Sequence, residues 1–139
     1  MYSSYFDDWQ VKPEFSKEFI SLWQGWLGKD NLHQLENVGE SEWSKFNDFI
    51  RLLNRNYQLY SVSHKTEKLM IVDDIEPLLS NHSESLEKDA SKFSNFVIPS
   101  LDCVIAEDWD YTYILWYRQS NVIKEIEPFL EQVNLCHFS

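Results

Sequence analysis

The segment 101–118, with the sequence LDCVIAEDWDYTYILWYR, places two apolar runs on either side of an acidic turn. The first run covers residues 101–106, the second covers 111–117, and the turn between them is Glu107, Asp108, Trp109 and Asp110. Runs rich in β-branched and aromatic residues around a short polar turn predict an antiparallel β-hairpin. Both faces of the second run are largely apolar, which is typical of a strand in the middle of a sheet. The fold is therefore expected to contain a sheet that is buried on both sides at its centre.

Helical spacing of apolar side chains predicts several helices around this sheet. They cover residues 14–27, 42–53, 83–96 and 122–133, the last of them interrupted or restarted at Pro128. Carboxylates just before Pro77 indicate a further helix start at 73–77. In the first two helices the apolar stripe is mainly aromatic, and we expect both stripes to pack into one core. The aromatic members are Phe15, Phe19, Trp23, Trp26, Trp43, Phe46 and Phe49.

Two more strands are predicted at 57–62 and 69–72, where apolar residues alternate or form a compact run. A chain of 139 residues is long enough to bury one core and too short to divide comfortably into two. Its 3 glycines and 4 prolines favour regular elements with short connections. The sequence thus predicts a single α+β domain over residues 1–139, with a mainly antiparallel sheet packed against several helices.

The formal net charge of -11 restricts the choice of partner. Binding to nucleic acid relies on lysine and arginine displacing counterions, and here 12 basic residues are outnumbered by 23 acidic ones. A nucleic-acid ligand is therefore not expected. The same charge accelerates association with a basic protein through long-range attraction, while its simplest alternative role is to keep the chain soluble.

We expect a cytoplasmic protein without a membrane span. Asp7 and Asp8 interrupt the first ten residues, which rules out the basic and apolar pattern of a signal peptide, and no apolar stretch approaches the ~20 residues that a span needs. The two cysteines, Cys103 in an apolar run and Cys136, are too few for a disulfide framework and are interpreted as buried or partly buried thiols.

No catalytic or metal-binding motif is present in the sequence. The four histidines are isolated, Cys103 and Cys136 lack a CxxC spacing, and the chain contains no GxSxG, P-loop or GxGxxG motif. We therefore expect no catalytic residues, no metal and no cofactor. One enzymatic alternative stays open: Glu107, Asp108 and Asp110 supply oxygen ligands for a divalent cation, as in a small metal-dependent enzyme. A melting temperature raised by such a cation would favour it.

The chain resembles a known class of proteins in its acidity and in two passages. These are KTEKLMIVDDIEPLL at 65–79 and DCVIAEDWDYTYILWYR at 102–118. It resembles the small acidic immunity proteins that bacteria encode beside polymorphic or contact-dependent growth-inhibition toxins. The resemblance implies tight binding in the cytoplasm to the C-terminal domain of a cognate toxin, which in such systems is often a nuclease with a basic surface. The hypothesis is that carboxylates accept bonds from toxin Lys and Arg while a Trp fills an apolar recess.

The residues expected to bind the toxin are the carboxylates and aromatic residues of the two passages. They are Asp73, Asp74, Glu107, Asp108, Trp109, Asp110 and Tyr111. A phage-type inhibitor or DNA mimic is the alternative within the class of binding proteins, although its carboxylates would form a repeating stripe and these cluster in turns and helix starts.

Overall fold

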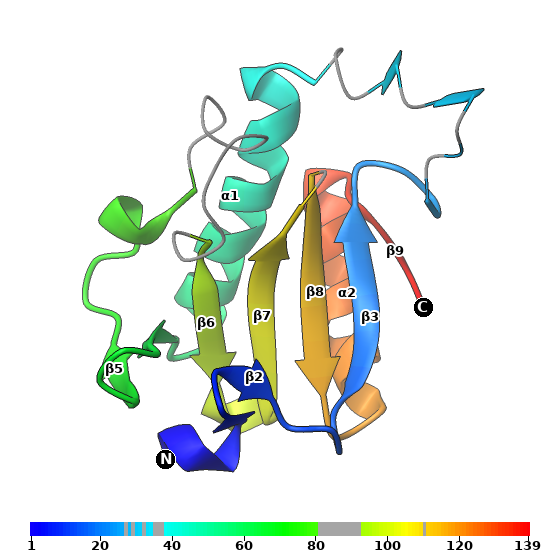
Figure 1. Cartoon of the computed structure of the whole chain (residues 1–139). Coiled ribbons are helices and arrows are strands. Elements are labelled where there is room, and N and C mark those ends of the chain that lie inside the picture. The colour runs from blue at the N-terminus through cyan, green and yellow to red at the C-terminus, as the bar shows by residue number, and fades with distance from the viewer. Residues whose placement is uncertain (27, 29, 32, 35–37, 81–92, 110) are drawn as a thin grey trace.

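A seven-stranded antiparallel sheet, in the order β5-β4-β6-β7-β8-β3-β9, is the framework of the computed structural model (Figure 1). The structure describes residues 1–26, 28, 30, 31, 33, 34, 38–80, 93–109 and 111–139. The strands of this sheet are β3 (Ser16–Ser21), β4 (Tyr60–Ser63), β5 (Lys68–Ile71), β6 (Asn95–Ile98), β7 (Cys103–Asp108), β8 (Thr112–Tyr117) and β9 (Cys136–Phe138). Because β8 lies between β7 and β3, its backbone is paired on both sides.

Two α-helices, α1 (Glu40–Asn56) and α2 (Asn121–Val133), contact each other and cover one face of the sheet (Figure 1). Apolar side chains at helical spacing on α1 face the strands, which present their own apolar residues in return. The buried stripe of α1 is Trp43, Phe46, Phe49, Ile50 and Leu53, and that of α2 is Val122, Ile126 and Leu130. The sheet contributes Ile20, Phe96, Ile98, Ile105, Tyr113 and Leu115 to the same core.

The N-terminal segment covers part of the opposite face of the sheet. It consists of a 3-10 turn (Tyr2–Ser4) and a small hairpin, β1 (Phe6–Asp7) and β2 (Gln10–Val11), which form a separate two-stranded sheet. Its aromatic side chains pack on Val97 and Val104, which are completely buried. The middle strands are therefore buried on both faces.

Arg118, just after β8, fastens this N-terminal segment to the sheet. Its guanidinium donates hydrogen bonds to Asp102 (2.9 Å), to Glu14 (3.1 Å) and to the carbonyl of Ser4, and it lies over the ring of Phe15 at 4.3 Å. Charge-assisted bonds to two carboxylates, combined with stacking on an aromatic ring, suit the planar guanidinium.

The α+β class and the antiparallel sheet are confirmed, and so are the best-defined local elements. The hairpin predicted at 101–117 exists as β7 and β8, and its second strand is central. The helix predicted at 42–53 is α1, and the strands predicted at 57–62 and 69–72 are β4 and β5. The thiol of Cys103 is buried as expected, and burial raises its pKa.

The helix predicted at 14–27 is wrong, because Ser16–Ser21 forms the strand β3. Local helix propensity is a weak preference that tertiary pairing overrides. Here β3 pairs with β8 over its full length and with β9 at residues 19–21 on its other edge, so that this half of the strand is paired on both sides. The expectation that Trp26 belongs to the core fails with the helix, since 63% of this residue is exposed.

Two other predicted helices are not found as α-helices in the described structure. Within the described ranges there are two α-helices, so "several" was an overestimate. The start predicted at 73–77 yields only a 3-10 turn, η3 (Glu76–Leu78), and η6 (Pro99–Leu101) is a second short turn. Of the helix predicted at 83–96, residues 83–92 lie outside the described residues and the end is strand β6.

The helix α2 continues through Pro128, contrary to the predicted interruption. Proline has no N–H, so Pro128 cannot donate the helical hydrogen bond to the carbonyl of Lys124. Both residues are exposed, and water can therefore solvate that carbonyl. Neither helix in the described parts of the chain is both long and apolar enough to cross a membrane.

Candidate functional site

Glu107, predicted to be exposed in the turn, is instead a buried residue of β7 that is only 4% exposed. Alternation along the strand turns its side chain toward the helices, opposite Tyr113. One carboxylate oxygen accepts a hydrogen bond from the Ser80 hydroxyl (2.8 Å), and the other accepts one from the backbone N–H of Ser94 (3.0 Å). The Glu107 N–H in turn donates to the Ser94 carbonyl (2.8 Å). Glu107 therefore joins segments that are distant in the sequence and does not offer its carboxylate to a partner.

Tyr111, on the other side of the turn, is also buried, with 3% exposed. Its ring meets that of Trp43 edge to face at 5.6 Å, and Trp43 donates to the Ser80 carbonyl at 3.4 Å. Tyr111 has φ 56°, a left-handed conformation that non-glycine residues adopt only when their surroundings hold them there. This residue supports the turn from inside the core.

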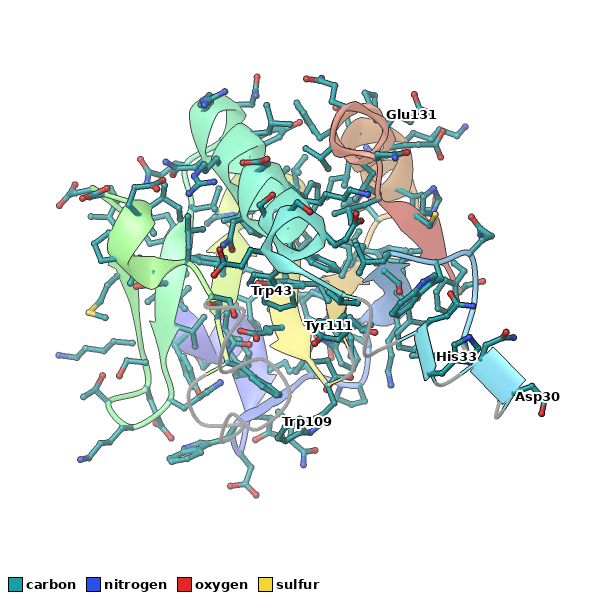
Figure 2. The ribbon with its side chains drawn as sticks, turned by 90° about the horizontal axis from the view of Figure 1, so that it is seen from above. Asp30, His33, Trp43, Trp109, Tyr111 and Glu131 are labelled. Atoms are coloured by element: carbon teal, nitrogen blue, oxygen red, sulfur yellow. The ribbon has the colours of Figure 1, made fainter. Side chains whose placement is uncertain are left out.

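Asp108 and Trp109, which we call the β7–β8 tip, point outward. Asp108 is half-buried, and Trp109 is 45% exposed with its ring edge to face with Phe93 at 4.7 Å. Figure 2 shows Trp43 and Tyr111 together in the middle of the molecule, with Trp109 further out. Asp110 lies outside the described residues. Of the five residues predicted at this turn, two are thus available at the surface in the described structure.

Asp73 and Asp74 are exposed, but they lie near the opposite end of the sheet. Through β4 and β6, Ile71 at the end of β5 is level with Val104 near the start of β7. Asp108 lies at the far end of β7, about 13 Å along the strand at roughly 3.3 Å per residue. Asp74 also accepts a hydrogen bond from the N–H of Glu76 (3.2 Å), which starts η3. The structure therefore separates the two predicted acidic groups.

A second exposed Trp beside carboxylates was missed by the sequence analysis. It is formed by Asp7, Asp8 and Trp9, which we call the β1–β2 tip. Trp9 is 59% exposed, and Asp8 and Trp9 have φ values of 52° and 67°, as a two-residue type I′ hairpin loop requires. The signal was present in the sequence, because Asp7-Asp8-Trp9 repeats the acid-acid-Trp order of Glu107-Asp108-Trp109.

His64, in the turn between β4 and β5, supports the β1–β2 tip. The ring of Trp9 stacks on the His64 ring with 5.8 Å between centroids, and Phe6 meets it edge to face at 4.9 Å. The Tyr2 hydroxyl lies 2.7 Å from His64 Nδ1. Partial burial lowers the pKa of His64, so the ring is neutral near pH 7 and its Nδ1 can accept the hydroxyl proton.

The outward carboxylates at both tips are available to a partner. Among the residues that the structure describes, the side chains of Asp7, Asp8 and Asp108 have no hydrogen-bonding or ion-pair partner. Because exposed carboxylates remain hydrated in the free protein, pairing them with partner cations carries little desolvation cost at the rim of an interface.

Glu107 and Asp108 do not converge as a metal site would require. They are successive strand residues on opposite faces, and both oxygens of Glu107 already accept hydrogen bonds. Within the described residues, no group of three or more His, Cys, Asp or Glu side chains is placed to hold a metal ion.

Comparison with known proteins does not assign the chain to a class: no protein-family model, curated protein or solved structure matches it.

Proposed function

We propose that this protein is an immunity protein that binds and neutralises a cognate bacterial toxin domain with a basic surface, such as a nuclease domain, in the cytoplasm. The observation that carries the proposal is the presence of two hairpin tips, each with an exposed Trp beside at least one carboxylate that lacks a partner in the described structure. This carboxylate is Asp108 at the β7–β8 tip, and Asp7 and Asp8 supply it at the β1–β2 tip. The net charge of -11 supports a basic partner.

The two kinds of side chain at a tip have different tasks in this proposal. A large aromatic residue that enters a recess of the partner buries much apolar area at low entropic cost, and Trp is enriched among the residues that dominate binding energy. The neighbouring carboxylates accept charge-assisted hydrogen bonds from Lys and Arg and exclude partners of the wrong charge. Truncating a Trp should therefore mainly accelerate dissociation, whereas neutralising a carboxylate should mainly slow association.

The buried residues of the predicted site act through the tip. Glu107 and Tyr111 are bonded or packed on either side of Asp108 and Trp109, which preorganises the β7–β8 tip. A preorganised binding loop loses less entropy on association. In this proposal Asp73 and Asp74 contribute long-range attraction because they lie far from that tip.

The test uses the large secreted protein that we expect the adjacent upstream gene to encode. Its C-terminal domain is expressed in bacteria with and without this chain, and growth is measured. Rescue by the wild-type chain is expected, together with a purified complex whose association rate falls as salt rises. A toxic C-terminal domain that this chain neither binds nor neutralises would overturn the proposal.

Variants of each tip locate the binding surface. We expect Trp109→Ala to weaken binding by about 2 kcal/mol or more through faster dissociation, and Asp108→Asn to slow association and flatten its salt dependence. Trp9→Ala and the double variant Asp7→Asn, Asp8→Asn are the matched changes at the β1–β2 tip. Trp26→Ala removes an exposed Trp that belongs to neither tip and serves as control. Unchanged binding rates in all tip variants would place the surface elsewhere.

A further inference from the structure

His137 in β9 lies between two carboxylates that come from different elements. Its Nδ1 is 2.6 Å from a carboxylate oxygen of Glu18 in β3, and its Nε2 is 3.1 Å from one of Glu127 in α2. The Glu18 side chain is almost buried and Glu127 is half-exposed. These contacts connect the outermost strand of the sheet to its neighbour β3 and to a helix.

Both contacts can be hydrogen bonds to ionised carboxylates only when each ring nitrogen carries a proton. An ionised carboxylate only accepts hydrogen bonds, and a neutral imidazole carries a single N–H, so it can donate to Glu18 or to Glu127 but not to both. Only the imidazolium satisfies both contacts. Partial burial lowers the pKa of His137, but the hydrogen bonds and charges of Glu18 and Glu127 outweigh this effect and raise it overall.

The other attachments of β9 to the sheet are few. The strand has three residues, pairs only with β3 among the described strands, and receives one hydrogen bond from the Gln24 amide to the His137 carbonyl (3.0 Å). Phe138 adds ring contacts with Phe19 (5.6 Å) and Trp26 (5.1 Å). A short outer strand of this kind belongs to the part of a protein that opens at low free-energy cost.

Among the described residues, the charged side chains that shift the pKa of His137 come from β3 and from α2. From β3 the only one is Glu18, because Lys17 alternates to the opposite face and lies over Trp116 at 4.9 Å. From α2 the charged group is Glu127. Gln24, which donates to the His137 carbonyl, is neutral. Both charged neighbours therefore favour the imidazolium.

We propose that His137, Glu18 and Glu127 form an acid-engaged latch that holds β9 on the sheet when His137 is protonated and releases it as the pH rises. Release frees the outer backbone edge of β3 at residues 19–21 and removes the Phe138 ring from that of Phe19. This inference does not depend on the proposed function, since it concerns a different edge of the sheet.

The sign of the effect follows from linkage. The folded pKa of His137 lies above its unfolded value of about 6.5. The latch therefore contributes its full stabilisation of β9 below about pH 6.5, and this stabilisation is lost as the pH rises through the folded pKa. Once the ring is neutral, one of the two carboxylates loses its donor, and the cost is greater if it is the nearly buried Glu18.

The test is amide hydrogen exchange of β9 between pH 5.5 and 8.5, corrected for the intrinsic pH dependence of exchange. We expect the protection of the amides of residues 136–138 to fall roughly ten-fold across this range, as the loss of one charge-assisted hydrogen bond implies, while β7 amides keep theirs. His137→Gln should show low protection at every pH, and Glu127→Gln should reduce the pH dependence. His33→Gln, at an exposed histidine outside the latch, should behave like the wild type.

Three results would overturn the latch. The first is a pH-independent protection of β9 in the wild type, and the second is the same pH dependence in His137→Gln as in the wild type. The third comes from NMR titration of the His137 ring in the intact wild-type protein, which needs no variant: a folded pKa at or below about 6.5 would show that the carboxylates do not hold the imidazolium.

Discussion

The β7–β8 tip and the β1–β2 tip carry the same short pattern of carboxylates and Trp, but the molecule supports them in different ways. The β7–β8 tip ends two six-residue central strands and is held from inside by Glu107 and Tyr111. The β1–β2 tip ends two-residue strands of a separate small sheet. Phe6 packs this sheet on His64, and Arg118, just after β8 of the main sheet, donates hydrogen bonds to the flanking residues Ser4 and Glu14.

This difference shows that exposure of a Trp does not report how firmly it is held. A tip continuous with the core opens only with the core, whereas a tip attached through a few side chains can open by itself. For binding, the β7–β8 tip therefore suits a preorganised anchor, and the β1–β2 tip suits a contact that adjusts on association.

The largest effect should come from Trp43→Ala, which removes the ring that packs on Tyr111 and Phe46. We expect the free energy of unfolding to fall by about 3–5 kcal/mol, because a nearly buried indole leaves a cavity that the core cannot refill. Urea denaturation measures the change, and Trp26→Ala, an exposed Trp, is the control. A loss below about 1 kcal/mol would show that the β7–β8 tip is not held through this contact.

The second-largest effect should be a local loss of protection at the β1–β2 tip. Arg118→Ala removes the bonds to Asp102 and Glu14, and we expect the Lys12 amide, which donates to the Tyr5 carbonyl at 2.9 Å, to exchange roughly ten-fold faster while β7 amides change little. Arg55→Ala, an exposed Arg near the end of α1, is the matched control. Equal acceleration at Lys12 and throughout β7 would mean that the two tips open together.

A third experiment separates the tips by pH. Because burial lowers the folded pKa of His64, the contribution of the neutral ring to stability is complete above about pH 6.5. This contribution is lost as the pH falls through the folded pKa. Protonation also removes the acceptor for the Tyr2 hydroxyl. The NMR signal of the Trp9 indole should therefore shift on acidification in the wild type and not in His64→Gln, while Trp109 stays unchanged. A Trp9 signal indifferent to acid would contradict the proposed support by His64.

The smallest effects on stability should come from truncating the exposed rings themselves. Trp9→Ala and Trp109→Ala should each change the free energy of unfolding by less than about 1 kcal/mol, since each residue is about half exposed in the folded protein and loses little burial on truncation. Thermal unfolding of both variants beside the wild type checks this. A loss of about 3 kcal/mol at either position would mark that Trp as a core residue and remove it from the candidate binding surface.

Elements set by nearby residues were predictable from the sequence. α1 shows one apolar stripe over its length, and the pairs β4–β5 and β7–β8 are each joined by a short connection. In such elements, side-chain periodicity and the turn reside within the same stretch of chain. The presence of acidic residues and a Trp where this hairpin reverses was equally predictable.

Tertiary structure decided the rest, because it depends on partners far away in the sequence. Ser16–Ser21 has a pattern compatible with helix and becomes β3 because β8 pairs with its full length and β9 with residues 19–21. The burial of Glu107 requires Ser80 and Ser94 to meet it, and the raised pKa of His137 requires Glu18 and Glu127 to converge on one ring. Local composition determined which side chains are available at each turn, and long-range packing determined which of them face water, since burial and charge pairing are properties of the assembled sheet and helices.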